Sequence, residues 1–192
     1  MKRILVVYFS HSGHTAFVAQ QLARRCRADL LAINDPNPRT GVLGYVSSAL
    51  ESLLGIQPPI GLDPCCLQEY DLVIVGTPVW FWNMSSPVRS FLTHYGSDCR
   101  QLAVFCTYGG SGQQRVLDGM ERLWGRPVVA RLALTDQQVT RRQHALALTR
   151  FVSEVKRWLQ RSEVQLASPE AAEPRQLLPR HEASDLVGTV SP

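Results

Sequence analysis

The chain has 192 residues, of which 45% are hydrophobic and 19% charged, and its formal net charge is +4 with a pI near 9.0. This is enough apolar surface for one globular domain with a full core and too little chain for two. The basic start is followed by no cleavage site, and 18 apolar residues run together nowhere. We therefore expect no signal peptide, no membrane span and a cytoplasmic location.

The charge is uneven along the chain. Residues 163–192 contain five acids and two arginines, so this segment carries −3 and residues 1–162 carry +7. No nucleic-acid motif accompanies these cations, so we interpret them as solvated helix faces that can attract a phosphorylated nucleotide or an acidic partner. The five cysteines are odd in number and lack C-x-x-C spacing, which argues against a disulfide framework, a zinc site and a thioredoxin-type redox pair.

A predicted strand, a polar turn and a helix open the chain. The apolar run from Ile4 to Phe9 is typical of a strand buried on both faces, and a helical pattern extends from Ala16 to about Arg25. The turn between them is Ser10, His11, Ser12, Gly13, His14 and Thr15. Its glycine lets the backbone close around a ligand, and amides at a helix N-terminus favour a phosphate.

This turn matches neither the ATP-type P-loop, G-x-x-x-x-G-K-[ST], nor the dinucleotide-binding pattern G-x-G-x-x-G, because it has one glycine and no lysine. A plain turn in which Ser and Thr cap the helix remains the alternative. Further along, we expect a second strand at Asp29–Ile33, a helix from Gly41 to Gly55, and an extended connection marked by Pro58, Pro59 and Pro64.

The clearest buried strand runs from Tyr70 to Gly76, and an aromatic loop follows it directly: Thr77, Pro78, Val79, Trp80, Phe81, Trp82, Asn83 and Met84. Aromatic rings clustered at the carboxyl end of a parallel strand are costly to leave in water. We therefore expect a flat ligand against Trp80 or Phe81, with Asn83 bonded to its edge. A small local core, or a contact within a homo-oligomer, is the alternative.

The second half of the chain continues the alternation of strands and helices. We expect helices at Ser86–His94, Gln114–Leu123 and Thr140–Gln160, and strands at Gln101–Cys106 and Pro127–Leu134. A second glycine-rich loop, Thr107 to Gly112, follows the fourth strand, where its glycines let a ligand approach the backbone or form a flexible turn.

Five strands alternating with five helices predict an α/β fold with an open parallel sheet in the order 2-1-3-4-5. That order brings the loops after the first, third and fourth strands to one edge. We expect this domain to span residues 1–161, followed by a Pro/Glu/Ala-rich tail at 162–192 that is mobile.

Two of these motifs carry a family resemblance. Ser10-His11-Ser12-Gly13-His14-Thr15 resembles the [ST]-x-[ST]-G-x-[ST] phosphate loop of the flavodoxin-like flavoproteins. Gly76-Thr77-Pro78-Val79-Trp80-Phe81-Trp82-Asn83-Met84-Ser85 is similar to the G-T-P-x-x-F-x-N-M segment of the NAD(P)H:quinone oxidoreductases first described as tryptophan-repressor-binding proteins. The resemblance covers residues 3–160.

The resemblance implies a flavodoxin-like three-layer sandwich that binds FMN. It implies that the phosphate lies at the first loop and the ring between the second and third, with Tyr108 over its second face. The cofactor-binding residues it implies are Ser10, His11, Ser12, Gly13, His14, Thr15, Thr77, Pro78, Val79, Trp80, Phe81, Trp82, Asn83, Met84, Thr107, Tyr108, Gly109, Gly110 and Gly112.

The implied function is an oxidoreductase that passes electrons from NAD(P)H through FMN to a quinone or similar small acceptor, with no side-chain acid or base required. The alternative is an electron carrier between redox protein partners, although such carriers are typically acidic and the folded part here is basic. A third hypothesis is a scaffold that kept the fold and lost FMN.

Overall fold

The computed structural model describes residues 2–33 and 67–167. The helix expected over 41–55, the prolines of the following connection, and residues 168–192 of the expected tail lie outside the described residues.

The sheet has the predicted strand order. Its parallel strands are β1 (Ile4–Tyr8), β2 (Asp29–Ala32), β3 (Leu72–Trp80), β5 (Leu102–Tyr108) and β6 (Arg131–Thr135), in the order β2-β1-β3-β5-β6. The short β4 (Asn83–Met84) pairs antiparallel with the end of β3 and adds nothing to that path. The predicted order 2-1-3-4-5 is therefore confirmed, with β5 and β6 as its fourth and fifth strands.

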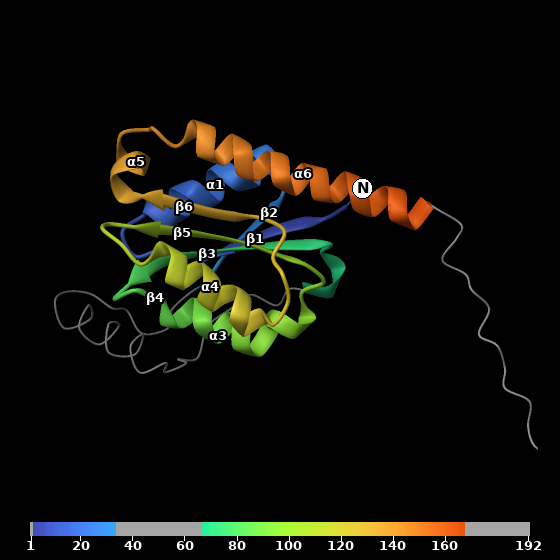
Figure 1. Cartoon of the computed structure of the whole chain (residues 1–192), viewed down its shortest axis with the longest axis horizontal. Helices are drawn as coiled ribbons and strands as arrows, with labels where there is room; N and C mark the ends of the chain where they lie inside the picture. The colour runs from blue at the N-terminus through green and yellow to red at the C-terminus, as the bar shows by residue number, and fades with distance from the viewer. Residues whose placement is uncertain (1, 34–66, 168–192) are drawn as a thin grey trace, which may run out of the picture.

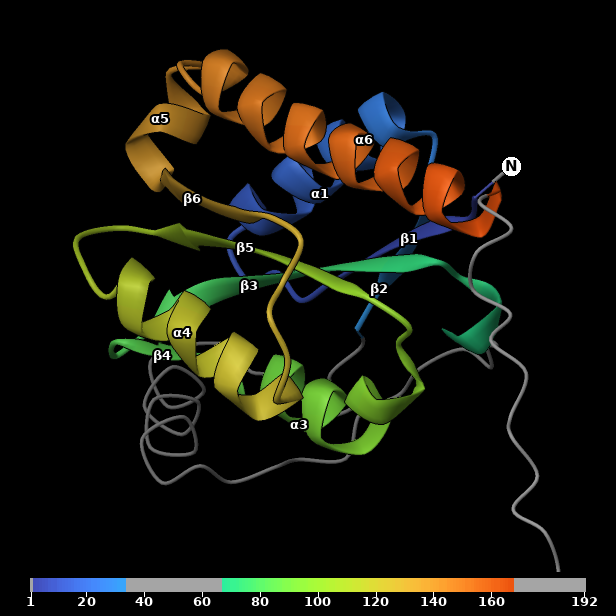
Figure 2. The same ribbon diagram turned by 45° about the vertical axis from the view of Figure 1, so that its right-hand side comes forward.

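Helices cover both faces of this sheet (Figure 1). On one face lie α1 (His14–Cys26), α5 (Asp136–Thr140) and α6 (Ala145–Ala167), and on the other lie α3 (Ser86–Tyr95) and α4 (Gln113–Trp124). The short 3₁₀ turns are Leu67–Glu69 and Gly96–Asp98. Turning the molecule shows the same three layers (Figure 2).

The alternation of side chains along the strands divides the core in two. Val6 and Ile74 pack beneath α1 and α6, whereas Val7 and Val75 pack beneath α3 and α4, and all four are fully buried. Successive strand side chains point to opposite faces, so continuous apolar runs are required where both faces are covered. This confirms the three-layer sandwich.

One glycine sets the spacing of the central strands. A Cβ built on Gly76 would lie 2.0 Å from Cζ of Phe105, the residue opposite it on β5. The Phe105 ring is fully buried across this position, so the central pair packs over a missing side chain. Gly76 is thus required by close approach within the sheet.

Several boundaries differ from the sequence prediction. β3 continues four residues past Gly76 to Trp80, because the segment expected as a loop pairs with β5 and then turns back as β4. The last strand begins at Arg131 and not at Pro127. A helix missed by the prediction, α5, precedes α6, and α6 extends to Ala167, past the helix end expected at Gln160.

Candidate functional site

Three loops meet at the carboxyl edge of the sheet. They follow β1, β3 and β5, which are parallel neighbours: Tyr8 at the end of β1 pairs with Gly76, and Gly76 pairs with Phe105. The amide of Phe9 donates to the carbonyl of Gly76 at 3.1 Å, which ties the first loop to β3. Carboxyl ends at a topological switch point are where open α/β sheets bind ligands.

The first loop has an open, left-handed turn at Gly13. This glycine is the N-cap of α1 with φ 88°, and a Cβ placed on it would meet nothing within 4 Å. Among the described residues, no side chain caps this helix. The alternative in which Ser and Thr serve as caps is therefore wrong, and the space beside Gly13 is open.

Ser10 adds an unsatisfied polar atom to this loop. Its Oγ is buried and finds no hydrogen-bond partner within the described part of the chain. Buried hydroxyls are normally paired, so an isolated one indicates that a partner is missing. A phosphate oxygen at the start of α1 would supply that partner and would also suit the uncapped amides.

Thr15 and Thr107 connect the first loop to the third. Their hydroxyl oxygens lie 2.8 Å apart and both side chains are buried, at 1% and 2% exposure. Each hydroxyl therefore has a protein partner already. These residues fix the distance between α1 and β5 beneath the site.

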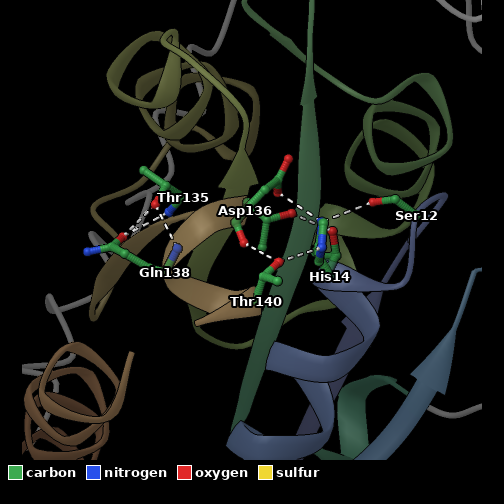
Figure 3. A network of polar contacts seen from close by, with 8 residues as sticks. Ser12, His14, Thr135, Asp136, Gln138 and Thr140 are labelled. Carbon is green, nitrogen blue, oxygen red and sulfur yellow. Dashed lines mark hydrogen bonds and ion pairs between the residues drawn. The ribbon is translucent and has the colours of Figure 1, made fainter. Parts of the chain in front are cut away.

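A polar network holds His14 at the start of α1 (Figure 3). Its Nδ1 lies 3.2 Å from Oδ1 of Asp136 and 3.3 Å from Oγ of Ser12, and its Nε2 lies 3.4 Å from Oγ1 of Thr140. Asp136 also approaches the third loop, since a Cβ on Gly109 would lie 3.6 Å from its Oδ2. The carboxylate thus stands between the first and third loops.

Asp136 and Thr140 were missed by the sequence prediction because α5 was missed. The signal was present in the sequence as Thr135-Asp136-Gln137-Gln138. In the structure Oγ1 of Thr135 accepts from the amide of Gln138 at 3.0 Å, and the amide of Thr135 donates to Oε1 of Gln138 at 2.9 Å. This is a capping box, which marks a helix start.

The second loop is a tight hairpin with two aromatic residues at its tip. Val79 pairs with Met84 and Trp80 with Asn83, so Phe81 and Trp82 form the turn, with φ 45° and 59°. Two-residue hairpin turns with two positive φ values normally use Asn and Gly, because bulky residues are strained there. Strain retained at an exposed tip points to a functional role.

The hairpin tip packs against the third loop, and between them lies an open cavity of about 320 Å³ lined by Val79, Phe81, Trp82, Gly109, Gly110 and Ser111. Trp82 donates from Nε1 to Oγ of Ser111 at 3.0 Å. A Cβ on Gly112 would lie 2.9 Å from the Cα of Trp82. Only a glycine therefore allows this close contact, and Phe81 and Trp82 remain 44% and 56% exposed beside the cavity.

The structure divides the aromatic segment in a way the sequence did not indicate. The Trp80 ring is 7% exposed and packs edge-on against Phe9, with ring centroids 5.4 Å apart. The sequence predicted a flat ligand against Trp80 or Phe81. In the structure the Trp80 side chain lies in the core cluster beneath α3 and α4, which Val79 also contacts, so the alternation of β3 side chains ends before Trp80. Phe81 and Trp82 are the exposed aromatics instead.

Other expected site residues also have mainly structural contacts. Thr77 is fully buried, and its hydroxyl donates to the carbonyl of Pro78 and accepts from the amide of Ser85. Met84 is buried in the core, and the side-chain amide of Asn83 donates from Nδ2 to the carbonyl of Phe81 at 3.4 Å. Tyr108 is half-buried and is absent from the lining of the cavity.

Two further observations limit the chemistry of this edge. Within the described ranges, no three His, Cys, Asp or Glu side chains are grouped to hold a metal ion. Burial raises the pKa of the Cys106 thiol, which lies beneath the third loop, to about 12. This thiol is therefore protonated near neutrality and is a poor nucleophile.

The chain belongs to a flavodoxin family, whose model matches residues 3–150. An NAD(P)H dehydrogenase (quinone) from Chromohalobacter salexigens is 30% identical over 119 residues, which cover 58% of this chain and 56% of the relative. One from Gluconacetobacter diazotrophicus is 32% identical over 101 residues, or 50% and 48% of the two chains. The chain thus spans about half the length of these relatives.

Solved structures support the same fold. A flavoprotein in complex with FMN from Lactobacillus acidophilus NCFM has a TM-score of 0.62 and 24% identity, with 73% of this chain and 98% of that chain covered. A WrbA-like flavodoxin from Agrobacterium tumefaciens has a TM-score of 0.50 and 16% identity, with 80% and 99% covered. At these identities the likeness concerns the fold alone. Separately, within residues 2–33 and 67–167 no helix has the length and hydropathy of a membrane span.

Proposed function

We propose that this chain binds FMN at the carboxyl edge of its sheet and passes electrons from NAD(P)H to a quinone or a similar small acceptor. The observation that carries the proposal is the pairing of an open left-handed loop at Gly13 with the aromatic-rimmed cavity of about 320 Å³ between the second and third loops. The loop at Gly13 suits a phosphate, and the cavity between the second and third loops suits a flat ring.

The phosphate end relies on dipoles and hydroxyls. The uncapped N-terminus of α1 presents amides to an anion, and the buried Oγ of Ser10 is available to donate to a phosphate oxygen. His14, held between Ser12 and Asp136, fixes the far side of the loop. This arrangement favours a phosphate ester over a neutral ligand.

The ring end relies on aromatic surface and backbone. Phe81 and Trp82 offer apolar area to a flat ring, and Gly109 and Gly110 let it approach the backbone of the third loop. The hydrogen bond from Trp82 to Ser111 holds the hairpin tip against that loop. These residues position a ring, and none of them has to act as an acid or a base.

When bound, FMN supplies the hydride and electron transfer that no side chain can perform. Relatives named NAD(P)H dehydrogenase (quinone) support this reaction over protein-to-protein electron transfer. The +7 charge of residues 1–162 supports it too, because a basic surface attracts an anionic nucleotide.

The test is turnover by the full chain after FMN is added and the excess removed. Oxidation of NADH or NADPH that depends on both FMN and a soluble quinone is the expected result. A yellow protein that is inert to both nucleotides but accepts single electrons from a flavoprotein reductase would overturn the reductase assignment in favour of the carrier. A protein that stays colourless would overturn FMN binding itself.

A further inference from the structure

A second hollow lies beside the hairpin of β3 and β4. Its volume is about 370 Å³, and it is lined by Asn83 and Met84 of β4, Arg89 of α3, and Arg115, Val116, Gly119, Arg122 and Leu123 of α4. Helices α3 and α4 pack side by side below the sheet, with β4 at one end of the pair (Figure 2). The hollow opens between these three elements.

The helical period places two of the arginines on one stripe. Arg115, Gly119 and Arg122 are spaced by four and three residues, so they share a face of α4. Gly119 has no side chain to fill the space between the two guanidinium groups, and a Cβ there would lie 3.2 Å from Cε of Met84. Gly119 thus lets the Met84 side chain approach α4 closely in the lining of the hollow.

The acids of α4 turn away from this stripe. Asp118 and Glu121 both pair with Arg131 on β6, and Oε1 of Glu121 also accepts from the amide of Val128 at 2.9 Å. Among the described residues, no carboxylate forms an ion pair with Arg89, Arg115 or Arg122. Three cations thus line one hollow while the nearby anions are used elsewhere.

Arg89 is the most buried of the three arginines. Its Nε is buried with no hydrogen-bond partner in the described part of the chain. Burial lowers the pKa of this guanidinium, which reflects the loss of water around the charge. An anion in the hollow would offset that loss, because a charged group removed from water needs an opposite charge and hydrogen bonds.

We propose that Arg89, Arg115 and Arg122 form a second anion site, which binds the phosphate or diphosphate group of a phosphorylated ligand. Guanidinium groups match phosphate oxygens in planar, bidentate pairs, and the volume admits a diphosphate. The site is continuous with the hairpin, since Phe81 and Trp82 line one cavity and Asn83 and Met84 line the other. The phosphate can belong to the pyridine nucleotide or to a separate phosphorylated metabolite; the first source rests on the proposed function.

The test measures binding of inorganic pyrophosphate to the full chain by calorimetry, with FMN saturating so that the first loop is not available. Wild type is compared with Arg115→Gln/Arg122→Gln, a pair that is exposed and so will not disturb folding, and with Arg89→Gln. The control is Arg150→Gln, which removes a cation from exposed α6 on the other face of the sheet. We expect saturable binding that the α4 pair weakens about tenfold or more and the control leaves within about twofold.

Two results would overturn the site: pyrophosphate that fails to saturate wild type, or an equal loss in the Arg150 control, which would mean bulk attraction only. Steady-state kinetics of the same variants then distinguish the two sources of the phosphate, the pyridine nucleotide and a separate metabolite. If the α4 pair raises the KM for NADPH or NADH with kcat unchanged, the phosphate is that of the pyridine nucleotide. If pyrophosphate binding is lost and both KM values hold, the ligand is a separate metabolite. A protein without turnover would contradict the proposed function and leave the pyrophosphate result valid.

Discussion

Gly112 shows how a single missing side chain joins two loops. Its φ is +99°, and a Cβ would lie 2.8 Å from Cδ1 and 2.9 Å from Cα of Trp82. Gly110, two residues earlier, has nothing within 4 Å of the same position. A side chain at Gly112 would therefore clash with Trp82, whereas one at Gly110 would not meet any atom within 4 Å.

We predict that Gly112→Ala destabilises the protein by about 1–3 kcal/mol, since the backbone of the hairpin tip must move. The displaced Trp82 would also weaken FMN binding by about tenfold or more, a loss of about 1.4 kcal/mol. Denaturant unfolding and FMN titration measure the two effects. Gly110→Ala should change the free energy of unfolding far less, and equal destabilisation by the two substitutions would contradict the close contact between Gly112 and Trp82.

Cys106 gives a prediction about alkaline pH. Its pKa is about 9 in an exposed chain and about 12 in the fold, so the folded state keeps its proton when the unfolded state has lost it. The free energy of unfolding therefore falls by up to about 1.4 kcal/mol per pH unit as pH rises above 9, until the folded thiol also ionises near 12.

The Cys106→Ala variant should lose less stability than wild type between pH 8.5 and about 10.5, whatever its stability at neutral pH. Denaturant unfolding across that range measures the difference. Equal slopes in the two proteins would mean that the buried thiol does not contribute.

At the scale of the element, the hairpin of β3 and β4 is the part of the site least visible in the sequence. Gly76 and Pro78 suggested that the strand ended, yet β3 continues because Thr77 and Pro78 lie opposite Cys106 and Thr107 of β5. Tertiary pairing overrode the local signal. The alternation along β3 does not extend to Trp80, because Val79 and Trp80 both contact the core cluster beneath α3 and α4.

The strain at the hairpin tip can be tested directly. Phe81→Asn places a residue that tolerates positive φ where φ is 45°, so the protein should be as stable as wild type or more stable by about 1 kcal/mol. FMN binding should weaken, because an apolar face of the cavity is lost. A clear loss of stability without any change in FMN affinity would contradict a role of Phe81 in ligand binding.

Helix α5 was missed for a different reason. Its five residues are too few for an apolar stripe to show, and only the capping box of Thr135 and Gln138 marked its start. Because α5 was missed, the prediction also missed Asp136, which pairs with His14 and lies beside Gly109. Polar residues that act through another loop leave no periodic signal, so the sequence did not indicate them.

At the scale of the whole molecule, the topology was predictable because it follows from a few strong rules. The apolar runs at β1, β3 and β5 require helices on both faces of the sheet. Right-handed connections then restrict the possible strand orders to a few. That order aligns three loops at one edge, so the sequence motifs located the candidate site. The sequence could not separate the rings that line the cavity from those in the core, because that depends on register.

The same architecture separates two kinds of surface. The edge with Gly13 and the hairpin tip suits a flat ring with one phosphate, whereas the face of α3 and α4 carries three arginines around a hollow beside that hairpin. Residues of one hairpin line both, since Phe81 and Trp82 border the first and Asn83 and Met84 border the second.

The measurement that tests the central claim most directly is an equilibrium titration of the full chain with FMN, followed by the fluorescence of the flavin. We predict saturation at one FMN per chain, with fluorescence altered by the aromatic hairpin. Gly13→Val should weaken binding sharply, because it fills the open space at α1 and strains the backbone at φ 88°. No saturable binding by wild type, or equal affinity in the Gly13 variant, would contradict the account.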